Sequence, residues 1–362
     1  MRLPIIGDDA GQIDEKLAIA MIRHAIDNGV NYIDTAYPYH KGTSEALTGK
    51  ALKDGYRDKV FLATKLPVWL VESADDTERY LNEQLERLGT EYIDFYLVHS
   101  LNQDSWEKTR KHNVLPYLEK AREQGKIRHI GFSFHDRLGL FKEIVDAYPW
   151  DFTQIQLNYM DENYQAGVEG MKYAHGKGLG IVVMEPLRGG KLVRNIPEDI
   201  LAKWKEADES RSPAEWALRW VFNHPEVSVV LSGMTTMPQV EENIRVSRDA
   251  AANSLSAEEL NLIGNIRDMY LEKTKVLCTD CGYCLPCPEG VAIPSVFGLY
   301  NDAVAYATSA VSRRFYGGLV EKGADASRCV SCGACLPKCP QAIEIIDQLA
   351  EAHRFLTEEE KI

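Results

Sequence analysis

Short apolar segments alternate with longer amphipathic segments between residues 30 and 235 of this 362-residue chain. The apolar segments are rich in Val, Ile, Leu and Phe, and they cover residues 30–34, 60–65, 93–99, 127–133, 152–158, 180–186 and 227–233. Nearly continuous apolar character, without one-sided alternation, is typical of parallel strands that are covered on both faces. The pattern therefore predicts seven parallel strands.

The segments between these strands have the spacing and the capping residues of helices. Ser73 with Asp76 forms a capping-box signature, and Ser212 followed by Pro213 marks a second helix start. Further helices are predicted at about 15–28, 114–124, 162–177 and 239–250. Strands that alternate with helices indicate a parallel sheet with right-handed crossovers, either an open doubly wound sheet or a closed (β/α)8 barrel.

Two observations favour the barrel. The glycine-rich turn GxGxxG of a dinucleotide-binding open sheet is absent, since the near match at 178–180 precedes a strand and lacks the third glycine. Asp34, Lys65, His99 and Ser133 each end a different predicted strand, and a barrel builds its active site at that rim. A barrel has eight strands, so we expect a (β/α)8 barrel whose first strand is largely missing from this chain.

Four chemically complementary side chains, Asp34, Tyr39, Lys65 and His99, lie at the ends of three successive predicted strands. Each alone has an ordinary structural interpretation, such as a turn aspartate or a solvated lysine, but their convergence favours an active site. NYIDTAYPYHKGTSEALTGKAL (31–52), FLATK (61–65) and DFYLVHS (94–100) resemble the aldo-keto reductase family over roughly residues 1–250. The resemblance is greatest to the subgroup with a C-terminal ferredoxin-like domain, and it implies that these four residues are the catalytic tetrad.

The chemistry of such a tetrad follows from the reaction. Hydride transfer to a carbonyl leaves an alkoxide, so the site needs a proton donor and a group that polarises the oxygen. Tyr39 can donate the proton, and a nearby Lys65 lowers the phenol pKa. Asp34 would pair with Lys65, and His99 would hydrogen-bond the carbonyl oxygen. Because no side chain donates a hydride, a cofactor is required.

The resemblance implies that the cofactor is a nicotinamide nucleotide. The residues that it assigns to the nucleotide are Ser133, Gln154, Met184, Pro186, Leu187, Gly233, Thr235, Gln239, Glu242 and Asn243. Residues 235–239 contain no lysine or arginine for a 2′-phosphate, which favours NADH over NADPH. Two positions depart from the family pattern: Phe134 replaces the usual asparagine, and Met184 replaces the tyrosine that many members stack on the nicotinamide.

All eight cysteines lie in the last quarter of the chain, at 278, 281, 284, 287, 329, 332, 335 and 339. The run 329–340 has the CxxCxxCxxxCP spacing of bacterial ferredoxins, whereas a zinc site has no role for a third cysteine at that spacing. We predict two [4Fe-4S] clusters, with Cys278, Cys281, Cys284, Cys287, Cys329, Cys332, Cys335 and Cys339 as ligands. The first run has only two residues before Cys287, so Cys287 could complete its own cluster or the neighbouring one.

Composition and net charge limit the possible location and partners of the protein. Apolar residues make up 45% of the chain and charged residues 26%, with no apolar run near the ~18 residues of a membrane span and no secretory signal pattern. A net charge of -13 disfavours nucleic acid and anionic membranes as partners. We expect a cytoplasmic protein with a barrel at 1–255, a linking helix at 256–276 and a small, mainly α-helical ferredoxin-like domain at 277–362.

Three functions fit these features. The first is a nicotinamide-dependent reductase of a small carbonyl, or dehydrogenase of an alcohol, that carries iron-sulfur clusters. The second is electron transfer between the nucleotide and a redox protein partner, which faces the obstacle that a hydride moves two electrons and a cluster one. The third is a non-catalytic, redox-responsive binding protein, which Phe134 and Met184 support and the complete tetrad opposes.

Overall fold

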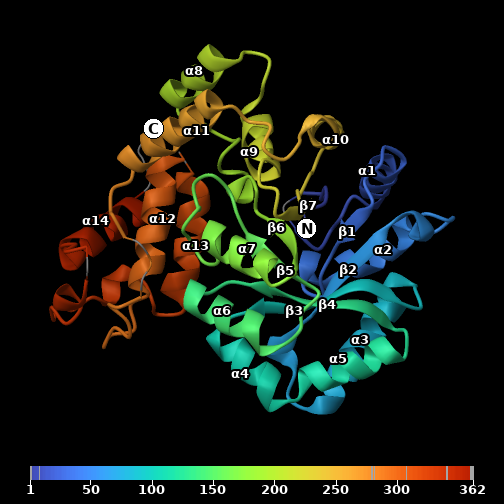
Figure 1. Cartoon of the computed structure of the whole chain (residues 1–362). Helices are drawn as coiled ribbons and strands as arrows, with labels where there is room; N and C mark the ends of the chain where they lie inside the picture. The colour runs from blue at the N-terminus through green and yellow to red at the C-terminus, as the bar shows by residue number, and fades with distance from the viewer. Residues whose placement is uncertain are drawn as a thin grey trace. The chain divides into compact units, whose positions relative to one another are not determined.

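A computed structural model of the chain describes residues 2–7, 9–278, 280, 282–306, 308–339 and 341–358 (Figure 1). The chain forms two compact units. The barrel unit contains Met1–Gly189 and Glu215–Ala257, and the C-terminal unit contains Gly190–Ala214 and Glu258–Ile362. The sequence pattern did not separate 190–214 from the barrel predicted at 1–255, and the predicted boundaries of the barrel, linking helix and ferredoxin-like domain stay predictions.

The barrel unit is built on one sheet of parallel strands. The strands are β1 (Tyr32–Asp34), β2 (Phe61–Leu66), β3 (Ile93–Leu101), β4 (Ile127–Phe134), β5 (Phe152–Gln156), β6 (Gly180–Met184) and β7 (Val227–Val230). Each pairs with the next in the order β1-β2-β3-β4-β5-β6-β7, and every pair is parallel. This confirms the predicted parallel barrel. Among the described residues the sheet has seven strands, and β1 does not pair with β7, so the barrel is nearly closed.

Helices lie outside these strands (Figure 1). They are α1 (Glu15–Asp27), α2 (Ser44–Ala51), α3 (Ala74–Leu88), α4 (Gln103–Lys111), α5 (Val114–Glu123), α6 (Leu138–Ala147), α7 (Gly167–Gly176), α9 (Pro213–Phe222) and α10 (Met237–Asp249). The predicted capping box of Ser73 and Asp76 opens α3. Helix α7 is shorter than predicted, because Gln165 and Gly167 adopt left-handed backbone conformations at φ 57° and φ 58°.

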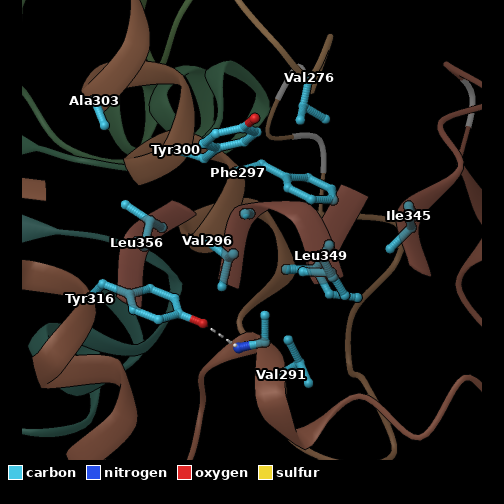
Figure 2. Packing of buried hydrophobic residues seen from close by; sticks show 13 residues of the cluster. Val276, Val291, Val296, Phe297, Tyr300, Ala303, Tyr316, Ile345, Leu349 and Leu356 are labelled. Atoms are coloured by element: carbon cyan, nitrogen blue, oxygen red, sulfur yellow. Dashed lines mark hydrogen bonds between the residues drawn. The ribbon is translucent and has the colours of Figure 1, made fainter. Parts of the chain in front are cut away.

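The C-terminal unit is helical, as predicted. Its helices are α8 (Glu198–Ala207), α11 (Ala257–Glu272), α12 (Ile293–Ala305), α13 (Ser309–Glu321) and α14 (Ile345–Thr357). Phe297 and Tyr300 of α12 pack with Tyr316 of α13 and Leu349 of α14 in one buried core (Figure 2). The Ala326 N–H donates to Tyr316 Oη at 3.1 Å, which ties the chain before the second cysteine run to this core. No helix in the described part of the chain is long and apolar enough to cross a membrane.

Candidate functional site

Asp34 and Lys65 form a buried ion pair where β1 and β2 end. Lys65 Nζ donates to Asp34 Oδ1 at 2.6 Å, to Asp34 Oδ2 at 2.8 Å and to the Thr35 carbonyl at 2.7 Å. The lysine side chain is fully buried. Burial lowers the pKa of Lys65, but Asp34 and Tyr39 raise it, and the net pKa lies above the ordinary lysine value. Lys65 is therefore a fixed ammonium inside the barrel rim.

Tyr39 and His99 complete the group of four. Tyr39 lies in the turn after β1, and Lys65 Nζ is 5.0 Å from the centroid of its ring. The rings of Tyr39 and His99 lie 6.0 Å apart and nearly perpendicular, at 81°. The structure thus brings all four predicted catalytic side chains together at the C-terminal ends of β1, β2 and β3.

A bulge in β3 helps to aim His99. The register of β3 against β4 shifts between Val98 and Leu101, and Ser100 adopts a left-handed conformation with φ 54°. Bulges next to active sites re-aim side chains in this way. The Ser100 N–H then donates to Ser133 Oγ at 2.8 Å, so the bulge is linked to a predicted cofactor residue.

The pKa of Tyr39 is the result of opposing influences. Lys65 has the largest effect and lowers the pKa, as expected from the sequence. Burial and the Asp34 carboxylate raise it, and together with Glu185 they outweigh the lysine, so the pKa lies above the ordinary tyrosine value. Tyr39 is thus protonated throughout the neutral range, as a proton donor must be.

His99 is held neutral. Burial, followed by the charge of Lys65, lowers the pKa of His99 well below its ordinary value. Its Nδ1 atom is buried without a hydrogen-bond partner among the described residues. Trp69, which the sequence did not single out, lies against it with 5.1 Å between ring centroids. A neutral imidazole can donate one hydrogen bond to a substrate oxygen without competing with Tyr39 for the proton.

Ser133 and Gln154 face each other across β4 and β5. They are direct partners in the register of these strands, and both are almost fully buried. Gln154 Nε2 donates to Met184 Sδ at 3.4 Å, whereas Gln154 Oε1 is buried and has no partner among the described residues. An unpaired buried acceptor at this point fits the amide group of a nicotinamide, which would supply the missing donor.

The remaining predicted cofactor residues lie in two segments of the barrel unit. Pro186 and Leu187 follow β6, while Gly233, Thr235, Gln239, Glu242 and Asn243 run from the end of β7 into α10. Gln239 Oε1 accepts the Thr235 N–H at 2.8 Å. The stem of Arg2 lies against Gly233, and Arg2 Nη2 is 3.1 Å from the position that a Gly189 β-carbon would occupy.

Arg2 therefore lies close to both predicted nucleotide segments, and no sequence motif singled it out. His40 was also missed, although it is adjacent to Tyr39. Its Nε2 accepts the Leu3 N–H at 3.0 Å, so Nδ1 is the atom that donates to the Ala10 carbonyl at 2.6 Å. His40 thus ties the N-terminal segment to the turn that carries Tyr39.

The cysteines form a separate centre in the C-terminal unit. One cavity is lined by Cys284, Cys287, Cys329, Cys332 and Cys335. Cys278 and Cys339 pack against the same hydrophobic core as their neighbours, and Cys281 lies outside the described residues. Burial, followed by the nearby sulfurs, raises the pKa of the Cys335 thiol. Among the described residues no three His, Cys, Asp or Glu side chains lie close enough together to bind one metal ion. A [4Fe-4S] cluster is larger than one ion, and each of its four irons is bound by a different cysteine thiolate.

A parallel barrel with this lysine, tyrosine and histidine together at its rim is the arrangement that the resemblance to the aldo-keto reductases predicted. Residues 5–268 match the aldo/keto reductase family, and residues 277–344 match the 4Fe-4S dicluster domain. The chain belongs to the aldo/keto reductase family and carries a C-terminal 4Fe-4S dicluster domain.

Similar proteins support the same assignment. An L-galactose dehydrogenase of Arabidopsis thaliana is 28% identical over 297 residues, which cover 76% of this chain and 91% of that protein. An aldo-keto reductase of Bacillus halodurans in its holo form has a TM-score of 0.60 at 27% identity, covering 73% of this chain and 91% of that one. An aldo/keto reductase of Klebsiella pneumoniae in complex with NADP and acetate has a TM-score of 0.59 at 25% identity, covering 74% and 90%.

Proposed function

We propose that this protein transfers hydride between a nicotinamide nucleotide and a small carbonyl or alcohol, with Tyr39 as the general acid and base. The observation that carries the proposal is the contact of Lys65 with both Asp34 and the Tyr39 ring in a buried site. A fixed ammonium beside a phenol stabilises the phenolate that forms when the phenol gives up its proton.

When bound, the nicotinamide supplies the hydride that the carbonyl carbon accepts. Tyr39 donates its hydroxyl proton to the carbonyl oxygen as negative charge develops there. Lys65 stabilises the resulting phenolate, and Asp34 holds the ammonium in position. Neutral His99 donates a hydrogen bond to the same oxygen and orients the substrate. Solvent then returns a proton to Tyr39, and the alcohol product leaves.

Ser133 and Gln154 would hold the nicotinamide amide, because Gln154 offers a buried acceptor without a partner among the described residues. The segments with Pro186 and Leu187 and with Gly233 to Asn243 would hold the rest of the nucleotide. Residues 235–239 offer no cation to a 2′-phosphate, so we propose a preference for NADH. The ratio of kcat/KM for NADH and NADPH measures this preference directly.

We further propose two [4Fe-4S] clusters with crossed ligation. The sulfurs of Cys287, Cys329 and Cys332 lie close enough to Cys335 to raise the pKa of its thiol, which supports these four as ligands of one cluster. Cys278, Cys281 and Cys284 would then hold the other cluster with Cys339, as in two-cluster ferredoxins. Of the two roles that the sequence left open for Cys287, its closeness to Cys335 supports ligation of the neighbouring cluster.

Anaerobic purification followed by turnover tests these proposals. Two clusters give about eight irons per chain and a broad absorption band, whereas less than one iron per chain would contradict the cluster proposal. NADH oxidation is then measured with a panel of aldehydes and ketones for the parent and for Tyr39→Phe. Equal activity of the two proteins would remove Tyr39 from the mechanism. NADH-dependent reduction of a one-electron acceptor without any carbonyl substrate would instead favour electron transfer to a redox partner.

A further inference from the structure

Glu45 is a buried carboxylate close to the tetrad that the mechanism does not use. It lies in α2 and is fully buried. Its Oε1 accepts from Thr64 Oγ1 at 2.6 Å and from Gln84 Nε2 at 2.6 Å, and its Oε2 accepts from Arg87 Nη1 at 3.3 Å. Burying a carboxylate costs folding free energy unless such donors surround it, so a functional role could explain its position.

The hydrogen bonds of Glu45 lead directly to Lys65. Thr64 precedes Lys65 in β2, and Gln84 Nε2 donates to the Lys65 carbonyl at 3.0 Å as well as to Glu45. Successive side chains of a strand point to opposite faces, so Glu45 holds the outer face of β2 where the Lys65 side chain enters the barrel. Tyr96 completes the set, because its hydroxyl donates to Gln84 Oε1 at 2.7 Å.

A second link joins α2 to β1. Ser44, the first residue of α2, shares a hydrogen bond of 2.9 Å with Thr35 through their hydroxyls. The Thr35 carbonyl in turn accepts from Lys65 Nζ. Helix α2 is thereby connected to both strands that supply the Asp34 and Lys65 pair, and every side chain in these links is fully buried.

We propose that Glu45 is a positioning residue that, through Thr64 and Gln84, fixes Lys65 against Asp34 and Tyr39. Hydrogen bonds to an ionised acceptor are stronger than neutral ones, so a carboxylate holds β2 and α3 more firmly than an amide would. The inference rests on the proposed function of Tyr39, because it assigns a role in tuning that residue.

Asp94 of β3 offers a matched control, because it contacts the other end of β2. It is also a buried carboxylate, its Oδ2 accepts the Leu62 N–H at 2.9 Å, and it pairs with Arg57 at 2.7 Å. Both acids therefore hold β2 through charge-assisted contacts. Asp94 does so where the strand begins, away from the rim, so its loss tests stability without touching the tetrad.

The test compares Glu45→Gln, Thr64→Val, Thr64→Ser and Asp94→Asn. For each variant, melting temperature, kcat and the nucleotide KM are measured, and Tyr39 is titrated by ultraviolet absorbance as the difference from the matching Tyr39→Phe protein. We expect Glu45→Gln and Thr64→Val to lower kcat roughly 10- to 100-fold with little change in nucleotide KM. The Tyr39 pKa should rise in both, since Lys65 then lowers it less. Thr64→Ser, which keeps the donor, should resemble the parent.

Asp94→Asn should lower the melting temperature and leave kcat and the Tyr39 titration unchanged. The inference is overturned if Glu45→Gln behaves in the same way as Asp94→Asn, or if Thr64→Val and Thr64→Ser titrate alike. If Glu45→Gln does not fold, the two Thr64 variants decide. The titration needs no substrate, so it tests the role of Glu45 even if turnover by the parent proves independent of Tyr39.

Discussion

The barrel rim and the cysteine centre differ in what holds their side chains in place. At the rim, Lys65 has all three ammonium donors paired with protein oxygens at 2.6 to 2.8 Å, and it is fully buried. In the C-terminal unit the described cysteines are only partly buried, and Cys332 is exposed. The pair of Asp34 and Lys65 is therefore held by protein contacts, whereas the proposed clusters would supply bonds to the cysteine sulfurs.

The nicotinamide subsite lies between these two cases. Gln154 Oε1 is a buried atom without a partner among the described residues. Leaving such atoms unpaired costs about 1 to 3 kcal/mol each, which a ligand recovers on binding. The protein alone therefore supplies most of the structure at the pair of Asp34 and Lys65, less at the predicted nucleotide subsite and least at the predicted cluster ligands.

Removal of iron should have the largest effect on the structure, and this effect should be confined to the C-terminal unit. Metal-coupled folding contributes on the order of 10 kcal/mol in small zinc domains, and the cysteine centre is of the same kind. After anaerobic chelation we expect amides of α12 and α14 to lose hydrogen-exchange protection, while those of β2 and β3 keep it. Equal protection of α14 with and without iron would show that the core around Phe297 and Leu349 holds the unit alone.

Tyr39→Phe should abolish most of the reductase activity without affecting either unit. Loss of a general acid costs roughly 100- to 10,000-fold in rate. Tyr32→Phe is the matched control, because Tyr32 lies in β1, just before the turn that carries Tyr39, and its hydroxyl is buried without a hydrogen-bond partner among the described residues. We expect Tyr32→Phe to retain activity and both proteins to keep the same iron content. A comparable loss in the two variants would contradict a specific role for Tyr39.

The sequence predicted those parts of the rim that depend on strand ends. Asp34, Lys65 and His99 each follow an apolar run, and residues in such positions of a parallel barrel must meet at one edge. It could not predict Trp69, His40 or Glu45. Their roles depend on side-chain contacts between elements that are far apart in the chain, such as Leu3 with His40, and no local pattern encodes these.

In the cysteine-rich part of the chain, too, some features could be predicted from the sequence and others depend on the fold. Spacing alone predicted the ligand set, since the run 329–340 has a motif with few other uses. The role of Cys287 could not be read from spacing, because it depends on which sulfurs the fold brings to one cavity. The membership of 190–214 in the C-terminal unit was missed for a similar reason: it depends on ion pairs such as Lys273 with Asp199 at 2.9 Å.

The pH dependence of reduction should report the electrostatics of the rim. Reduction needs protonated Tyr39, so kcat should stay constant through neutral pH and fall as pH rises through the raised Tyr39 pKa. Lys65→Met removes the influence that lowers this pKa and should move the fall to higher pH, with a smaller kcat throughout. A shift to lower pH, measured in the same buffers, would mean that Lys65 does not govern Tyr39.

The smallest effect concerns a protein contact inside the C-terminal unit that involves no metal. Lys191, directly after the loop with Pro186 and Leu187, forms an ion pair with Asp302 of α12, and both side chains are partly buried. Asp302→Asn should lower the free energy of unfolding by about 1 kcal/mol, because it weakens a hydrogen-bonded pair without removing its shape. Urea denaturation of the iron-loaded protein measures this change.

Lys203→Met is its control, since Lys203 pairs with Glu206 at the surface, where both are more than half exposed, and such a substitution should change stability by less than about 0.5 kcal/mol. The same pair of variants is then compared after iron removal. If Asp302→Asn no longer changes the stability of the iron-free protein, the contact of Lys191 with α12 forms only in the iron-loaded protein. The structure of 190–214 then depends on the bound metal. If the effect persists, this part of the C-terminal unit is held by protein contacts alone, like the barrel rim.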